Sequence, residues 1–239
     1  MLRLSLFLWI ATTLAAMAED IDLELVLLAD ASGSITDEEI RFQRAGYAEA
    51  ITDNRVVQSI KNTAYGAIAV TYVEWAANTA VVVDWTRINN AASARAFAEQ
   101  LLSPPRQAFG RNAIGGALLD GKRLIETNAF EGWRKVIDFS GDSPNSFSGP
   151  PISFARDEVV AAGITINALP ILCRFCDTAA RYPNLADIYE DQIIGGRGAF
   201  VVTAYSEEDL VEAIVRKLVL EISGTMPAYP VAGLEHEEK

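Results

Sequence analysis

Three oxygen-bearing side chains lie within five residues near the start of the chain. Asp30, Ser32 and Ser34 form a D-x-S-x-S pattern, in which a carboxylate is followed by two hydroxyls. Small hard cations such as Mg²⁺ prefer oxygen ligands of this kind. The other interpretation is an ordinary strand-to-helix turn, because Asp and Ser are also common helix caps. The pattern by itself leaves both interpretations open.

A second carboxylate follows a later apolar run. Asp142 comes directly after the predicted strand 135–140, within the segment Ser140–Asn145. An Asx turn is the alternative interpretation, because aspartate often bonds its own backbone in turns. If both preceding runs are parallel strands, Asp30 and Asp142 lie at the same edge of one sheet.

The composition excludes several classes of chemistry. The chain has 239 residues, of which 50% are hydrophobic and 22% are charged, as in an ordinary globular domain. The net charge of -12 disfavours binding to nucleic acid. His236 is the single histidine and lies in the charged C-terminal segment, so mechanisms built on a positioned imidazole are not expected. Two cysteines cannot form a four-thiolate metal site.

The elements that would position these side chains follow from the apolar periodicity. The run 22–29 is almost continuously apolar, as in a strand buried on both faces. Thr36 and Glu39 have the spacing of a capping box at the start of a helix. The predicted strands are 22–29, 66–75, 79–85, 135–140, 164–169 and 199–203, and the predicted helices are 36–53, 89–102, 114–125, 152–162, 185–193 and 206–222.

This order predicts an α/β fold with three layers. Only residues 76–78 separate two of the strands, which is too short for a helical crossover, so those strands pair antiparallel. The prediction is therefore a doubly wound six-stranded sheet with five mutually parallel strands, one antiparallel edge strand and helices on both faces. Ligand sites in such sheets lie beyond the carboxyl ends of the strands.

The glycine-bounded segment Gly110–Leu118 lies between the two carboxylate-bearing segments. Together, in this order and on this strand pattern, the three segments resemble the von Willebrand factor type A (vWA) domain and its metal-ion-dependent adhesion site (MIDAS). The resemblance covers about 22–222. Segments 73–76, 184–187 and 195–200 further resemble a narrower group of short secreted bacterial vWA-like proteins of unknown function.

The resemblance implies a ligand set for one divalent ion. Asp30, Ser32, Ser34 and Asp142 match the family in residue type and place. Where the family usually has threonine, this chain has Asn112, whose amide can offer a neutral carbonyl oxygen. The expected ion is Mg²⁺, with Mn²⁺ or Ca²⁺ as alternatives.

Two functions from different classes are compatible with such a site. The resemblance implies a non-enzymatic module in which a carboxylate of a partner protein occupies the open position on the ion. The alternative is a metal-dependent hydrolase of an exported phosphate or ester, which would need a general base beside the ion. The candidate bases are Asp30, Asp142 and Asp37, and the first two already serve as metal ligands, which favours binding over hydrolysis.

The first 18 residues have the composition of a secretory signal peptide. Arg3 precedes the apolar run 4–17, and Ala16–Ala18 has the small-x-small form of a cleavage site. The run is too short to span a bilayer, which takes about 20 residues. The expected organisation is a signal peptide over 1–18, a vWA-like domain over 19–223 and a flexible acidic tail over 224–239, in a periplasmic or extracellular protein.

Cys173 and Cys176 form a C-x-x-C pair. In an exported protein this spacing favours a small local disulfide. A thioredoxin-like redox pair is the alternative, but the rest of a thioredoxin pattern is missing from the sequence.

Overall fold

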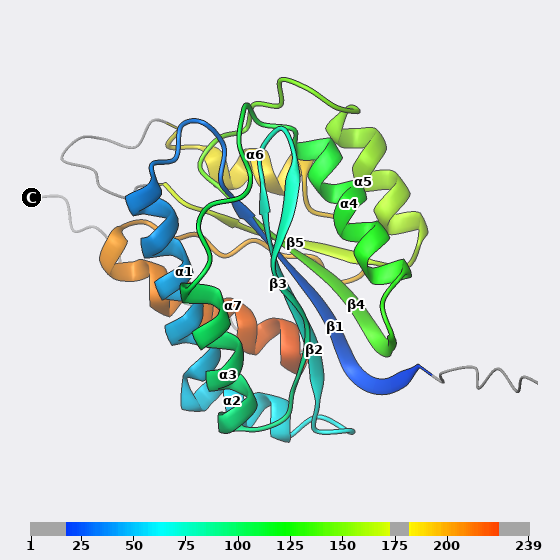
Figure 1. Cartoon of the computed structure of the whole chain (residues 1–239). Helices are drawn as coiled ribbons and strands as arrows, with labels where there is room; N and C mark the ends of the chain where they lie inside the picture. The colour runs from blue at the N-terminus through cyan, green and yellow to red at the C-terminus, as the bar shows by residue number, and fades with distance from the viewer. Residues whose placement is uncertain (1–17, 173–181, 225–239) are drawn as a thin grey trace, which may run out of the picture.

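The computed structural model describes residues 18–172 and 182–224. Its centre is one sheet with the strand order β3-β2-β1-β4-β5 (Figure 1). β1 pairs in parallel with β2 on one side and with β4 on the other, β4 pairs in parallel with β5, and β3 pairs antiparallel with β2. The strands are β1 (Glu19–Asp30), β2 (Ile68–Trp75), β3 (Thr79–Ile88), β4 (Phe130–Gly141) and β5 (Thr165–Pro170).

Helices cover both faces of the sheet. The helices are α1 (Asp37–Thr52), α2 (Asn54–Lys61), α3 (Ala91–Leu102), α4 (Ile114–Glu126), α5 (Ile152–Ala161), α6 (Leu185–Gln192) and α7 (Glu207–Ser223). Helices α1, α2, α3 and α7 lie on one face, and α4, α5 and α6 lie on the other (Figure 1). This is the predicted three-layer α/β arrangement.

The central strand explains how two cores form from one apolar run. Side chains alternate between the two faces of a strand. Leu25 and Leu27 belong to the core beneath α1 and α7, whereas Val26 and Leu28 belong to the core beneath α4 and α5. All four side chains are buried, which is why the run appears continuously apolar in the sequence.

Side-chain caps fix where several helices begin. The predicted capping box of α1 is present, because the backbone N–H of Glu39 donates to Thr36 and that of Thr36 donates to Glu39. Asp53 ends the predicted first helix but also caps a second one, since it accepts a hydrogen bond from the backbone N–H of Arg55. Helix α2 follows directly from this cap and was not predicted.

The prediction of six strands is wrong, because the sheet has five. The segment after Gly198 does run alongside β5, but it forms only isolated bridges there. Backbone bonds join Ala168 N–H to the carbonyl of Phe200 and Leu172 N–H to that of Ala204. Between these two donors lies Pro170, which has no N–H and so cannot supply the intervening bond. The ladder is interrupted at that point.

Some predictions concern residues outside the described ranges. These are the signal peptide up to residue 17, the disulfide between Cys173 and Cys176, and the tail beyond residue 224. Within the described ranges, no helix is long and apolar enough to cross a membrane.

Candidate metal-binding site

The D-x-S-x-S segment forms a compact turn where β1 ends. The Asp30 carboxylate is buried, and its Oδ1 accepts a hydrogen bond of 2.8 Å from the backbone N–H of Ser32. The Oγ atoms of Ser32 and Ser34 lie 3.3 Å apart. Three of the five predicted ligands are therefore brought together by one local turn.

The turn lies at the switch point of the sheet. The chain leaving β1 passes through α1 and α2 on one face, whereas the chain leaving β4 passes through α5 on the other. A crevice opens between adjacent strands whose connections diverge in this way. Asp30 and Asp142 terminate or directly follow these two strands, so they lie at the expected place for a ligand site.

Gly141 allows the two strand ends to approach closely. A Cβ atom at this position would lie 3.3 Å from Oδ2 of Asp30 and 2.7 Å from the hydroxyl oxygen of Tyr189. Tyr189, from α6, donates a hydrogen bond of 3.0 Å to the carbonyl of Ser143 and so holds the turn that carries Asp142. In the described part of the chain, Oδ1 of Asp142 is buried and has no hydrogen-bond partner.

Backbone bonds tie the Asn112 segment to both other loops. The N–H of Gly33 donates to the carbonyl of Gly110 at 2.7 Å, and the N–H of Phe147 donates to the carbonyl of Asn112 at 2.8 Å. The Asn112 side chain is buried, and its Nδ2 has no hydrogen-bond partner among the described residues. Asn112 therefore lies between the turn of Asp30 and the loop that follows Asp142.

Arg106 stabilises the D-x-S-x-S turn through hydrogen bonds to its backbone. Its guanidinium donates to the backbone carbonyls of Ala31, Ser32 and Ile35, the last two at 3.0 and 2.9 Å. Its Nε donates to the carbonyl of Ala108 at 2.9 Å. One side chain thus joins the turn that carries Ser32 to the loop that leads to Asn112, a contribution that sequence analysis missed.

A buried ion pair stabilises the same loop, which leads to Asn112. Arg44 on α1 contacts Glu74 on β2, with Nε 2.9 Å from Oε1, and both side chains are almost fully buried. The second carboxylate oxygen of Glu74 accepts a hydrogen bond from the N–H of Gln107, and Arg44 also donates to the carbonyl of Pro104. The available signal in the sequence was a single charged residue within the otherwise uncharged run 68–75.

The donor set fits a hard divalent cation. It consists of two carboxylates, two hydroxyls and one amide, all of which can offer oxygen. The described residues contain no cluster of three or more His, Cys, Asp and Glu side chains, so they offer no alternative site of the zinc type. The buried carboxylate oxygen of Asp142 that lacks a hydrogen-bond partner is a group that a cation would satisfy.

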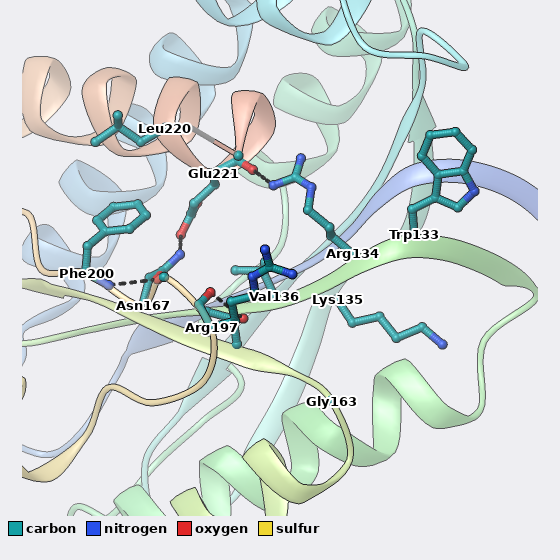
Figure 2. Close-up of a pocket in the computed structure, with 13 residues that line it drawn as sticks. Trp133, Arg134, Lys135, Val136, Gly163, Asn167, Arg197, Phe200, Leu220 and Glu221 are labelled. Atoms are coloured by element: carbon teal, nitrogen blue, oxygen red, sulfur yellow. Dashed lines mark hydrogen bonds between the residues drawn. The ribbon is translucent and has the colours of Figure 1, made fainter. Parts of the chain in front are cut away.

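A separate cavity lies at the opposite edge of the sheet, where β4 and β5 begin (Figure 2). Its volume is about 500 Å³. Asn167 and Glu221 line this cavity, and Asn167 donates to Glu221 at 3.0 Å (Figure 2). Lys217, which does not line the cavity, pairs with Glu221 and, at 2.8 Å, with Asp138. Burial raises the pKa of Glu221 to about 7, although the charge of Lys217 acts in the opposite direction. None of the predicted metal ligands lines this cavity.

The model of one protein family matches residues 20–226, and its description reads "Protein of unknown function (DUF1194)". The chain belongs to the DUF1194 family. No curated protein matches the chain.

Solved structures identify the fold of this DUF1194 member as that of vWA domains. A vWA protein from Catenulispora acidiphila has a TM-score of 0.58 at 17% identity, over 85% of this chain and 43% of its own. Proximal thread matrix protein 1 from the mussel byssus, with a zinc-occupied MIDAS motif, has a TM-score of 0.58 at 17% identity. That match covers 87% of this chain and 50% of the mussel protein. This chain thus spans about half the length of those two proteins.

A third similar structure is a single domain of comparable size. It is the von Willebrand factor domain of the type V pili tip protein Mfa5 from Porphyromonas gingivalis. The TM-score is 0.56 at 12% identity, and the match covers 88% of this chain and 98% of that domain. At these identities the similarity establishes the vWA fold of the DUF1194 member.

Proposed function

We propose that this protein is an exported, non-enzymatic binding module that recognises a partner protein through a divalent cation. The ligands would be Asp30, Ser32, Ser34, Asn112 and Asp142, with Mg²⁺ as the expected ion and Mn²⁺ or Ca²⁺ as alternatives. The observation that carries the proposal is the convergence of three loops at the switch point of the sheet, joined by backbone hydrogen bonds.

The charge of the donor set explains how a partner would bind. Two carboxylates formally balance a divalent cation, and the hydroxyls and the amide add no charge. An incoming carboxylate therefore meets no net negative charge at the ion. When bound, the cation would supply a positive centre for the partner's Asp or Glu, and a charge-assisted contact would form.

The similar structures support the class of protein proposed here, a protein-binding module. Mfa5 is a pili tip protein, and the mussel protein is a thread matrix protein with a zinc-occupied MIDAS motif. Both names indicate proteins that act outside the cell. Together with the signal-like residues 1–18, they support a periplasmic or extracellular location for this chain.

The hydrolase alternative receives less support from the site. It needs a general base that is not already a metal ligand, and Asp37 was the remaining candidate. Asp37 lies beside Arg106, with 3.6 Å between Oδ1 and Nη1. The Asp37 side chain is 71% exposed and pairs with a guanidinium, which is not the arrangement of a general base held beside a bound ion.

The test is a thermal melt of the mature chain in Mg²⁺, in Mn²⁺ and in excess EDTA. A cation that binds only the native state raises the melting temperature. We expect this rise in the wild type, and we expect Asp30→Ala to abolish it while the EDTA-treated variant still unfolds cooperatively. Asp191→Ala, which removes an exposed aspartate on α6, is the matched control and should keep the rise. An equal response of Asp30→Ala and wild type would refute the assignment.

A further inference from the structure

Two exposed phenylalanines and one arginine surround the Asn112 segment. Phe109 is 57% exposed and Phe147 is 53% exposed, which is unusual for large apolar side chains. Arg111 is also exposed, and its guanidinium carbon lies 4.0 Å from the centroid of the Phe147 ring. We call Phe109, Arg111 and Phe147 the aromatic rim.

The aromatic rim is attached to the candidate site through the backbone. Phe147 donates its N–H to the carbonyl of Asn112, and Gly110, between Phe109 and Arg111, accepts from the N–H of Gly33. Phe109 is held in turn by Asn78, whose Oδ1 accepts its N–H at 2.9 Å. These hydrogen bonds fix the backbone of the rim relative to the segments that carry the proposed ligands.

Arg111 has no ion pair within the described ranges of the chain. Stacking on Phe147 holds the guanidinium in place and leaves its edge able to donate hydrogen bonds. This arrangement suits a carboxylate, which guanidinium binds through two parallel hydrogen bonds.

We propose that the aromatic rim selects partner segments that carry two carboxylates and an adjacent apolar side chain. The inference rests on the proposed function, because the first carboxylate would occupy the cation. The second would pair with Arg111, and the apolar side chain would pack on Phe109 and Phe147. Consecutive Cα atoms are about 3.8 Å apart, so Arg111 and Asn112 are close enough for one short segment to reach both.

The experiment is a selection of short random peptides, displayed on phage, against the immobilised mature chain in Mg²⁺ with elution by EDTA. We expect the eluted peptides to be enriched in two acidic positions beside an apolar one. On Arg111→Gln we expect one acidic position to lose its enrichment. Arg197→Gln, which removes an exposed arginine at the opposite edge of the sheet, is the matched control and should select the same peptides as wild type.

Titration of selected peptides then assigns each acidic position. Replacing the second carboxylate by its amide should weaken binding to wild type by about tenfold, as for a charge pair at an interface, and should not weaken binding to Arg111→Gln further. Phe147→Ala should reduce the preference for the apolar residue.

The possible failures are distinguishable. Enrichment of a single acidic position on both wild type and Arg111→Gln would overturn the aromatic-rim proposal and leave the metal-dependent function standing. Failure of EDTA to elute any enriched peptide from wild type, with Asp30→Ala behaving identically, would overturn the proposed function itself.

Discussion

Asn112 is the proposed ligand for which the vWA resemblance implies a threonine instead. Its side chain is buried between two loops, and its amide nitrogen has no hydrogen-bond partner in the described structure. A threonine would present a hydroxyl closer to the backbone from a β-branched side chain with less rotamer freedom to lose. The identity of this one residue should therefore control the affinity for the cation.

We expect Asn112→Thr to bind Mn²⁺ more tightly than wild type and Asn112→Ala to bind it more weakly, with changes on the order of tenfold or less. Calorimetric titration of the three proteins at fixed pH and salt is the measurement. Equal affinities would show that Asn112 is not a ligand. Tighter binding by Asn112→Ala would show that the asparagine blocks the site.

Arg106 acts on the candidate site through backbone carbonyls. Hydrogen bonds from a charged donor contribute about 1.5–3 kcal/mol each to stability, and this guanidinium makes several, so Arg106→Gln should lower the free energy of unfolding by at least about 2 kcal/mol. It should also weaken Mn²⁺ binding, because the turn of Ser32 loses its support. Urea denaturation in EDTA measures the first effect and calorimetry the second. An unchanged Mn²⁺ affinity would limit Arg106 to a role in stability.

At the residue scale, the sequence predicted which side chains lie together where the contacts are local. Asp30, Ser32 and Ser34 fall within one turn, so their spacing alone brought them together. The partners of Arg106 in the turn that carries Ser32 are carbonyls 71 to 75 residues away. Backbone carbonyls leave no trace in the sequence, so no pattern could have indicated this contact.

At the scale of elements, α4 packs against its neighbours through a glycine. A Cβ atom at Gly115 would lie 2.2 Å from the carbonyl oxygen of Pro150, whereas one at Gly116 would meet nothing nearer than 3.8 Å. The two adjacent positions in the same helix therefore differ in the space available for a side chain.

Alanine substitution at these positions should have opposite effects. Replacing glycine by alanine within a helix gains about 0.5–1 kcal/mol, so Gly116→Ala should stabilise the protein by up to that amount. Gly115→Ala should destabilise it by about 1–3 kcal/mol or more, because overpacking outweighs the gain in helix propensity. Urea denaturation of both variants is the measurement. Similar stabilities would show that α4 can shift away from Pro150 at little cost.

The sheet was largely predictable because its strands contain apolar runs and their connections have diagnostic lengths. The short connection 76–78 correctly indicated an antiparallel pair. The sixth strand failed for a local reason, since Pro170 withholds one hydrogen bond from a segment that otherwise follows β5. Helix α2 was missed because Asp53 both ends one helix and caps the next.

At the scale of the whole molecule, charged groups are buried between the sheet and α7. Lys217 and Glu221 from α7 meet Asp138 from β4, with Asn167 of β5 and Arg134 of β4 nearby. Burial raises the pKa of both Asp138 and Glu221. The folded protein therefore retains protons that the unfolded chain releases at lower pH.

This buried cluster predicts a pH dependence of stability. A carboxyl group whose folded pKa exceeds its unfolded value stabilises the fold below the unfolded pKa, and that stability is lost as the pH rises through the folded pKa. For Glu221 the pH window runs from the ordinary glutamate pKa of 4.5 to the raised pKa of about 7. The free energy of unfolding should fall by about 3 kcal/mol across this window, at about 1.4 kcal/mol for each pKa unit.

We expect the free energy of unfolding of wild type to fall between pH 5 and 7.5 and that of Glu221→Gln to change less, as urea denaturation across this range would measure. Glu212→Gln is the matched control on the same helix, because the hydrogen bonds from Arg55 lower the pKa of Glu212 below this window. A wild-type stability that rises with pH would contradict the assignment.

Both ends of the described domain lie away from the candidate site. β1 begins at Glu19, at the edge of the sheet where β4 also begins, and Gly224 after α7 lies against Arg134 near the start of β4. The turn of Asp30 lies at the other end of β1 (Figure 1). Any anchor or further module joined before Glu19 or after Gly224 would be attached at the end of the sheet where β1 and β4 begin. The cation would then face outward at the tip, where an approaching partner meets it before it meets the tether.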